Sequence, residues 1–367
     1  MRAVRILGTR GVPATHGGFE TFAERLGLYL VARGWAVSIY CQEHGRGPVV
    51  EDEWQGIHRI RIPVDMRGAK GTVLFDWKAT VHATRSKELC LTLGYNTAIF
   101  GLVLRVLGVR NVINMDGIEW LRAKWGAIAK SWFYANDWIG CWVGNHLVAD
   151  HPQIRDHLSS RVKDSKITMI PYGADAVETA PTQAVEALGL MPGKYLTLIA
   201  RAEPENSILD VVRGFSMKPR GFELAVLGKY DAVRNAYHRA IQDAAGPEVK
   251  FLGAIYDKQV LQALRFHSVA YVHGHQVGGT NPSLVEALGA SNPVLAHDNR
   301  FNRWVAGPSA RYFPDAGSFS KLLDQVLSSE AVRDEMRRGS RQRFQEAFTW
   351  PDVLAQYEAI LERFLRQ

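Results

Sequence analysis

Residues 273–294 read HGHQVGGTNPSLVEALGASNPV and join a buried strand to a helix through a glycine-bearing loop. The apolar run Val269–Val272 predicts the strand, and Asn281 is the predicted N-cap of the helix, with Pro282 at its first position. A helix N-terminus offers free backbone N–H groups and the positive end of the helix dipole, so this junction suits a phosphate or sugar phosphate. An ordinary loop with a surface carboxylate, Glu286, fits the pattern equally well.

Short apolar runs alternate with helical patterns along the whole chain, which is typical of parallel α/β sheets. Phe19–Ala32 is one such helical stretch. Strands are expected at Val4–Leu7, Ala36–Tyr40, Leu89–Leu93, Asn111–Met115, His146–Ala149, Ile167–Ile170, Tyr195–Ala200, Glu223–Leu227, Val249–Leu252, Val269–Val272, Val294–Ala296 and Arg311–Phe313. The sequence therefore predicts doubly wound sheets, whose ligands bind at the carboxyl ends of the strands.

The length of 367 residues predicts two domains, because a single core stops growing at about 250–300 residues. The boundary is expected at Pro171-Tyr172-Gly173, which gives an N-terminal domain of residues 1–171 and a C-terminal domain of residues 172–349. Residues 350–367 are expected to form an amphipathic helix, which either returns to the first domain or ends the second.

Composition indicates an ordinary globular protein, with 47% hydrophobic and 22% charged residues. We expect no signal peptide and no membrane-spanning helix, because no run of 18 apolar residues occurs. The three cysteines lie far apart in apolar runs and are expected to be reduced core thiols of a cytoplasmic protein. Paired Cys/His spacings and acidic loops are missing from the sequence, so no metal site is expected.

The positive charge is concentrated in the first half of the chain. Residues 1–170 contain 22 Lys and Arg against 15 Asp and Glu (22 − 15 = +7), whereas residues 171–367 contain 22 of each. Nucleic-acid motifs are not found, so an anionic membrane surface is the expected partner, with an unevenly charged solvated surface as the alternative. Trp120–Tyr134, a predicted helix that interleaves aromatic and basic residues, suits a membrane interface or a core helix with snorkelling cations.

The run GGTNPSLVEALGASNPV resembles the donor-sugar segment of retaining nucleotide-sugar glycosyltransferases with the GT-B fold. HGHQVGGTNPSLVEAL, together with GTRGVPATHGGFETF (8–22) and NMDGIEWLRAKW (114–125), looks most like bacterial rhamnosyltransferases of polysaccharide assembly. The resemblance implies two Rossmann-like doubly wound domains facing across a cleft, with the final helix crossing back to the first domain.

The same resemblance implies transfer of L-rhamnose from dTDP-β-L-rhamnose to a lipid-linked saccharide in cell-surface polysaccharide biosynthesis. It implies no metal and no cofactor beyond the nucleotide-sugar co-substrate, and a peripheral protein at the inner face of the cell membrane. The alternatives are a GDP-mannose or UDP-hexose donor, a catalytically inactive GT-B partner protein, and a GT-B-shaped epimerase, which the transferase-like motifs disfavour.

On the donor side, Arg201 ends the predicted strand Tyr195–Ala200 and can fork onto phosphate oxygens, unless it forms a surface salt bridge with Glu203 or Glu205. The family places a lysine where this chain has Asn206, and a first glutamate where it has Gly278. By resemblance, Glu286 binds the nucleotide ribose. The remaining expected donor-binding residues are His275, Gly279, Thr280, Asn281 and Ser283.

On the acceptor side, Asp116 follows the predicted strand Asn111–Met115, and its carboxylate is expected to orient or partly deprotonate an acceptor hydroxyl. The glycines of THGGFE (15–20) do not have the dinucleotide spacing. They form either a plain surface loop or, by resemblance, a loop beside the acceptor and the donor phosphates. The expected residues of this region are Gly17, Gly18, Glu20 and Glu119.

Overall fold

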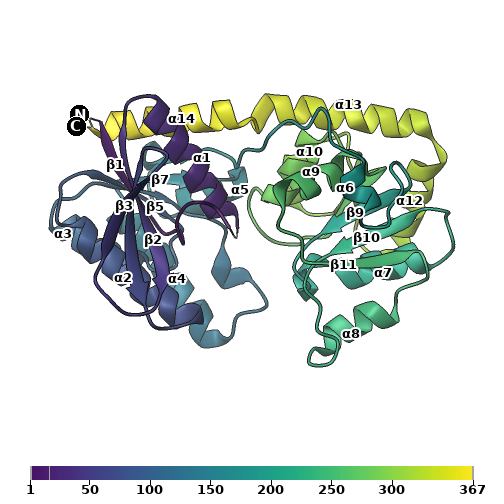
Figure 1. Ribbon diagram of the computed structural model, residues 1–367, viewed down its shortest axis with the longest axis horizontal. Helices are drawn as coiled ribbons and strands as arrows, with labels where there is room; N and C mark the ends of the chain where they lie inside the picture. Colours follow the sequence, from purple (N-terminus) through teal and green to yellow (C-terminus); the bar gives the residue numbers. More distant parts are fainter. Residues whose placement is uncertain (1, 16, 366–367) are drawn as a thin grey trace. The chain divides into compact units, whose positions relative to one another are not determined.

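The computed structural model describes residues 2–15 and 17–365. The chain forms two compact units, each built on its own sheet, which is mainly parallel in the first unit and parallel in the second (Figure 1). The first unit contains the chain up to Pro171 and the segment from Trp350 onward, and the second contains Tyr172–Thr349.

The sheet of the first unit has eight strands in the described residues, all parallel except the edge strand, which pairs antiparallel with its neighbour. Helices α2, α3 and α4 lie on one face of this sheet, and α1 and α14 lie on the other (Figure 1). In sheet order the strands are β3 (Val50–Trp54), β4 (Ile57–Val64), β2 (Ala36–His44), β1 (Ala3–Leu7), β5 (Leu89–Leu93), β6 (Asn111–Asn114), β7 (His146–Ala149) and β8 (Ile167–Met169). The helices are α1 (Gly18–Ala32), α2 (Gly68–Ala83), η1 (Ala98–Phe100), α3 (Gly101–Val106), η2 (Glu119–Leu121), α4 (Ala127–Val143), α5 (Pro152–Ser159), η3 (Asp164–Lys166) and α14 (Trp350–Leu365).

Packing of α14 explains why the end of the chain belongs to the first unit. The Tyr357 ring lies 4.6 Å from the Phe22 ring of α1, and its hydroxyl accepts a hydrogen bond of 2.7 Å from Asn114 Nδ2. Both tyrosine contacts are buried, so the apolar stripe of α14 completes the core on this face of the sheet. The helix predicted for residues 350–367 is thus found over Trp350–Leu365, and residues 366 and 367 lie outside the described part.

The sheet of the second unit has six parallel strands in the described residues. Helices α7, α8 and α12 cover one face, and α9 and α10 cover the other (Figure 1). In sheet order the strands are β11 (Val249–Gly253), β10 (Glu223–Leu227), β9 (Tyr195–Ile199), β12 (Ala270–His273), β13 (Val294–His297) and β14 (Arg311–Phe313). The helices are α6 (Gln183–Glu186), η4 (Pro204–Asn206), α7 (Ile208–Ser216), α8 (Ala236–Asp243), α9 (Lys258–Phe266), α10 (Pro282–Gly289), α11 (Arg300–Ala306), α12 (Ala316–Ser328) and α13 (Glu330–Ala347).

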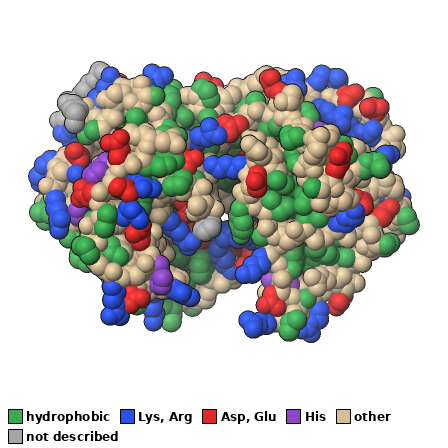
Figure 2. Space-filling model, in the orientation of Figure 1, with side chains coloured by type: hydrophobic (Ala, Val, Ile, Leu, Met, Phe, Trp, Pro, Cys, Tyr) green, Lys and Arg blue, Asp and Glu red, His purple; other side chains and the backbone are tan. Residues whose placement is uncertain are grey.

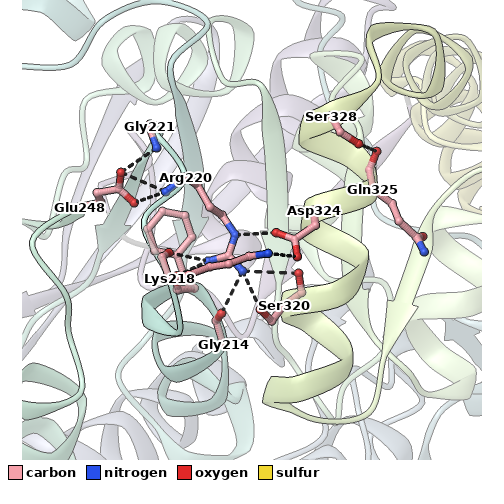
Figure 3. Close-up of polar contacts among 10 residues, drawn as sticks. Gly214, Lys218, Arg220, Gly221, Glu248, Ser320, Asp324, Gln325 and Ser328 are labelled. Carbon is pink, nitrogen blue, oxygen red and sulfur yellow. Dashed lines mark hydrogen bonds and ion pairs between the residues drawn. The ribbon is translucent and has the colours of Figure 1, made fainter.

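One buried arginine ties α7 and α12 to the start of β10 (Figure 3). The Arg220 guanidinium donates to Ser320 Oγ at 2.6 Å and to Asp324 Oδ1 at 3.1 Å, and it also reaches the carbonyl oxygen of Phe215. The Arg220 backbone N–H donates to Glu248. These acceptors supply the hydrogen bonds and the negative charge that the Arg220 guanidinium needs inside the protein. They therefore hold α7 and α12 together on the face of the sheet opposite α10.

The structure confirms the predicted parallel strands and differs from the sequence prediction in two places. The hairpin of β3 and β4 was not predicted, because its strands place charged residues among the apolar ones. The predicted helix Trp120–Tyr134 is wrong in its first half, where a short 3-10 turn and an extended segment precede α4. Within residues 2–15 and 17–365, no helix is long and apolar enough to cross a membrane.

Candidate functional site

The second unit brings together two loops at the carboxyl ends of adjacent strands. The chain passes from β9 outward to β10 and β11, and then returns to β12 on the other side of β9. This reversal makes the space after β9 and β12 the topological switch point, where ligands bind in open α/β sheets. The two loops are joined by Gln276, whose backbone N–H donates to Glu205 O at 2.9 Å and whose side chain donates to Ser207 Oγ at 2.9 Å. A Cβ atom on Gly274 would lie 2.1 Å from Asn206 O, so this close approach requires glycine.

Helix α10 begins as the sequence predicts. Asn281 is its N-cap, and Asn281 Oδ1 accepts a hydrogen bond of 3.0 Å from the Ser283 backbone N–H, with Pro282 at the first position. Thr280, immediately before the cap, is buried. The loop that feeds this end contains Gly278, whose φ of 141° is a conformation that side chains other than glycine rarely adopt. The helix N-terminus therefore lies at the end of a loop shaped by glycine.

Glu286 is held by a buried arginine that the sequence analysis did not single out. Arg265 Nη2 lies 2.5 Å from Glu286 Oε2, and the side chains are 4% and 39% exposed, respectively. The same nitrogen donates to Ser283 Oγ at 3.2 Å, and Ser283 Oγ also lies 2.6 Å from the Tyr271 hydroxyl. The carboxylate is thus fixed in orientation while part of it remains accessible to a ligand. An arginine within the apolar run LQALRF is the sequence signal that could have revealed this residue.

Arg201 lies at the carboxyl end of β9 and is exposed. Within the described chain no residue forms an ion pair with its guanidinium, so the alternative of a salt bridge to Glu203 or Glu205 is not found. Asn206 is buried, and its Nδ2 donates to Arg201 O at 2.8 Å, which closes the turn between these residues. Asn206 therefore shapes the backbone around Arg201, and the Arg201 side chain is available to an anion.

The two histidines of the loop are stacked, with ring centroids 4.3 Å apart. His273 is fully buried, and burial together with neighbouring His275 and His297 lowers its pKa well below the usual value, which keeps the ring neutral. His275 is partly exposed, and its carbonyl oxygen accepts hydrogen bonds from Asn299 and Asn302. His275 is thus the solvent-accessible ring of the pair.

In the first unit, Asp116 follows β6 with a positive φ of 52°, held by its N–H donating to Asn114 Oδ1 at 2.9 Å. Burial raises the pKa of Asp116 to about 6, and the negative charge of Glu119 adds to the shift. Such a carboxylate titrates close to neutral pH, where a group that shares a proton with a substrate hydroxyl is effective.

Glu119 is engaged within its own loop. Its carboxylate accepts from Arg122 Nη1 at 2.7 Å and from Trp125 Nε1 at 2.9 Å, and its backbone N–H donates to the Tyr95 hydroxyl at 2.9 Å. The structure therefore places Glu119 as a support of the 119–125 loop beside Asp116, with its oxygens already hydrogen-bonded.

The glycine loop before α1 places Gly17 at the N-cap and Gly18 at the first helical position. Glu20 lies in the first turn of α1, buried, and lines a pocket in the first unit. In the described part of the chain no group of three or more His, Cys, Asp and Glu side chains is arranged to hold a metal ion.

Comparisons with solved structures identify the architecture. Over its full length the chain is similar to sucrose-phosphate synthase (tll1590) from Thermosynechococcus elongatus, with a TM-score of 0.85, 18% identity and 100% of each chain covered. The fold is GT-B. A Burkholderia xenovorans α,α-trehalose-phosphate synthase (UDP-forming) in complex with glucose-6-phosphate (TM-score 0.76, 12% identity) and Anabaena Alr3699/HepE in complex with UDP and glucose (TM-score 0.76, 11% identity) are also similar, each over 99% of this chain and 100% of theirs.

These similarities confirm the predicted GT-B architecture of two Rossmann-like domains. A family model described as a domain of unknown function (DUF1972) matches residues 1–175, which is slightly less than half of the chain. No curated protein matches the sequence.

Proposed function

We propose that this protein is a retaining glycosyltransferase that transfers L-rhamnose from dTDP-β-L-rhamnose to a lipid-linked saccharide in cell-surface polysaccharide biosynthesis. The observation that carries the proposal is the switch point of the second unit. There, Arg201 follows β9 and forms no ion pair with any residue that the structure describes, and the neighbouring strand β12 leads to the N-terminus of α10, the helix that carries the fixed carboxylate of Glu286.

The chemistry of a nucleotide-sugar donor matches these groups. Negative charge on the diphosphate grows as the glycosidic bond breaks, and a free guanidinium and backbone N–H groups stabilise that charge without a metal ion. Glu286 is suited to accept hydrogen bonds from ribose hydroxyls, because Arg265 holds it in one orientation. In the retaining mechanism that the resemblance implies, the acceptor attacks on the face from which the leaving group departs, and the departing phosphate takes its proton.

The proposed donor sugar follows from the loop 274–280. Gly278 and Gly279 offer backbone N–H groups and space but no carboxylate, so we expect a sugar whose hydroxyl pattern differs from that of the common hexoses. A 6-deoxy sugar such as L-rhamnose fits the resemblance of the surrounding motif. A UDP-hexose is the second candidate, since the similar HepE structure contains UDP and glucose; GDP-mannose is a third.

Thermal unfolding with a panel of nucleotides separates these donors, because a ligand that binds only the folded state raises the melting temperature. We expect dTDP to give the largest shift, and the purified protein to release dTDP from dTDP-rhamnose. A larger shift with UDP or GDP would replace the donor, and the absence of any nucleotide shift would favour a catalytically inactive partner protein.

We also propose that the first unit binds an anionic membrane surface at the inner face of the cell membrane, where a lipid-linked acceptor is found. Helices α2, α3 and α4 pack side by side and expose large apolar side chains. Ile128 is 90% exposed and Val106 is 82% exposed, and the exposed tryptophans are Trp77, Trp132, Trp138 and Trp142. Arg105 lies over the Trp142 ring at 5.1 Å, so cations accompany these aromatic rings as at a lipid interface.

Net charge alone does not indicate a membrane-binding surface, because such a surface needs basic and apolar side chains close together. On the face seen in Figure 2, Lys and Arg side chains are interspersed with Asp and Glu over both units. The large apolar side chains that α2, α3 and α4 expose therefore support the proposal more than the net +7 of residues 1–170 does.

A further inference from the structure

Asn114 is the last residue of β6, and its backbone is held inside the sheet of the first unit, between β5 and β7. Its carbonyl oxygen accepts a hydrogen bond of 2.9 Å from the Gly94 N–H, which follows β5, and on the other side it lies in register with Val148 of β7. The residue is only 6% exposed. Its position is therefore set by the sheet, and only the orientation of its carboxamide has to be fixed by other contacts.

Both ends of this carboxamide are hydrogen-bonded, to residues that are far apart in the sequence. Asn114 Oδ1 accepts from the Asp116 N–H at 2.9 Å, and Asn114 Nδ2 donates to the Tyr357 hydroxyl of α14 at 2.7 Å. A backbone N–H can only donate, so the amide oxygen must face Asp116 and the amide nitrogen must face Tyr357. The two contacts thus agree on a single orientation of the amide.

Tyr357 is itself fixed and neutral. It is 2% exposed, and its ring packs against the Phe22 ring of α1. Burial raises the pKa of Tyr357 above its usual range, the hydrogen bond to Asn114 opposes this rise, and the negative charge of Asp150 adds to it. The hydroxyl therefore remains protonated at neutral pH, and its oxygen is a permanent acceptor for Asn114 Nδ2.

Asp116 depends on the other end of the amide for its backbone conformation. Its φ of 52° lies in the left-handed region, which aspartate enters at a cost in free energy. The hydrogen bond to Asn114 Oδ1 offsets this cost, because it holds the Asp116 N–H back toward the end of β6. Asp116 is partly exposed, so its carboxylate is held in a defined place without being closed off from a ligand.

The groups that act on the Asp116 carboxylate come from the loop that follows it and from Tyr95. Burial is the main cause of the raised pKa of Asp116; the negative charge of Glu119 adds to it, and the positive charges of Arg122 and Lys124 oppose it. The Tyr95 hydroxyl accepts from the Glu119 N–H at 2.9 Å and so lies beside the same loop. A change in the Asp116 backbone would move its carboxylate relative to all of these groups and out of its buried position.

We propose that Asn114 is a positioning residue for Asp116, and that α14 holds Asn114 in its working orientation through the Tyr357 hydroxyl. The last helix of the chain is thereby part of the acceptor-side site. That Asp116 acts on an acceptor hydroxyl rests on the proposed function, whereas the support of Asp116 by Asn114 and Tyr357 does not.

Replacing Tyr357 with phenylalanine tests the proposal, because it removes one hydroxyl and keeps the ring that packs against Phe22. The buried Asn114 Nδ2 would lose its acceptor, so the amide should reorient and release the Asp116 N–H. By NMR titration we expect the pKa of Asp116 to fall by at least about half a unit toward the usual 3.8, because its carboxylate becomes less buried. Its signal is assigned by its absence from Asp116→Asn. Asn114→Ala should cause a larger shift in the same direction, since it removes the acceptor itself.

Tyr29→Phe is the matched control. The Tyr29 hydroxyl of α1 donates to Glu358 Oε2 of α14 at 3.1 Å, so this variant also removes a tyrosine hydroxyl between α14 and the rest of the first unit. It should leave the pKa of Asp116 unchanged. An unchanged pKa in both Tyr357→Phe and Asn114→Ala, whatever their melting temperatures, would show that Asn114 serves only the fold. An equal shift in Tyr29→Phe would also overturn the proposal, because it would point to the docking of α14 as a whole.

Turnover of dTDP-rhamnose separates this result from the proposed function. In an active enzyme, the rise of kcat with pH near 6 should move to lower pH in Tyr357→Phe, by the same shift that NMR gives. A shifted pKa in a protein that turns over no nucleotide sugar would support the positioning role and refute the proposed function. Turnover that rises near pH 6 in the wild type and in Tyr357→Phe alike, with no change in the pKa, would refute the positioning role alone.

Discussion

Replacing Glu286 with alanine tests the donor site most directly, because this carboxylate has two partners. Toward the ligand it is the proposed acceptor of ribose hydroxyl hydrogen bonds. Toward the protein it lies 2.5 Å from Arg265 Nη2, which is itself buried. The substitution should therefore change both nucleotide affinity and stability, and the two effects have separate physical causes.

The magnitudes follow from these contacts. Loss of a charged hydrogen-bond acceptor should weaken dTDP binding by about 1–3 kcal/mol, or roughly 5- to 150-fold in Kd. Arg265 would lose its counter-ion but keep its hydrogen bonds to Ser283 Oγ and Leu261 O, and Glu286 is 39% exposed. We therefore expect the free energy of unfolding to fall by about 1–2 kcal/mol, less than the loss for a fully buried pair. Glu286→Gln keeps a neutral acceptor and should show smaller changes in both quantities.

Titration calorimetry with dTDP and denaturant unfolding measure the two effects on the same samples. Glu335→Ala, an exposed position on α13, is the matched control and should change neither. A folded Glu286→Ala protein with the wild-type Kd and reduced stability would show that Glu286 serves only as the counter-ion of Arg265, and the ribose assignment would be wrong.

Three other perturbations address the remaining proposals. Arg201→Ala should lower kcat more than it raises KM, because diphosphate charge grows in the transition state; an effect on KM alone would contradict its role. Turnover should rise with pH through about 6 as Asp116 ionises, and Asp116→Asn should be slow without that rise. Because the pKa of Asp116 in the folded protein lies above the usual 3.8, the stability of the wild type should fall as the pH rises from about 4 to about 6. The asparagine variant should therefore be more stable than the wild type above about pH 6, but not below about pH 4. Ile128→Glu with Val106→Glu, at positions 90% and 82% exposed, should release the protein from anionic vesicles without loss of folding or dTDP binding, and unchanged co-sedimentation would refute the membrane face.

Much of the fold could be predicted because core strands are local apolar runs. Leu89–Leu93 is buried in the middle of the sheet, and its boundaries are those that the sequence indicates. The β3–β4 hairpin lies at the edge, where Ile57–Val64 alternates arginine with isoleucine. This alternation is visible in the sequence, but the arginines make the segment resemble a polar loop when the alternation is overlooked.

The misplaced helix has a different cause, which is tertiary. Trp120 Nε1 donates to Asp137 Oδ2 and Trp125 Nε1 donates to Glu119 Oε2, each at 2.9 Å. These contacts hold the segment between η2 and α4 in a non-helical conformation, although its residues are compatible with a helix. Pairings such as these, and the contact of Arg265 with Glu286 across two helices, depend on packing that no local pattern encodes.

Gly278 lies where the family that the sequence resembles has its first glutamate, and this difference bears on whether the proposed donor site is active. Its φ of 141° places the loop in a conformation that glycine adopts freely, although a Cβ atom there would meet nothing within 4 Å. The backbone is thus shaped for glycine, and a glutamate at this position would be strained even though there is space for it. If the site had only lost a glutamate, we would expect the backbone at position 278 to keep a conformation that residues other than glycine can adopt. The neighbouring groups that we propose to bind the nucleotide are also in place, namely the Asn281 cap, the Arg201 side chain, which forms no ion pair with any residue that the structure describes, and the Glu286 carboxylate held by Arg265. This combination supports our proposal of an active enzyme whose donor sugar needs no carboxylate at position 278, against the alternative of a catalytically inactive partner protein.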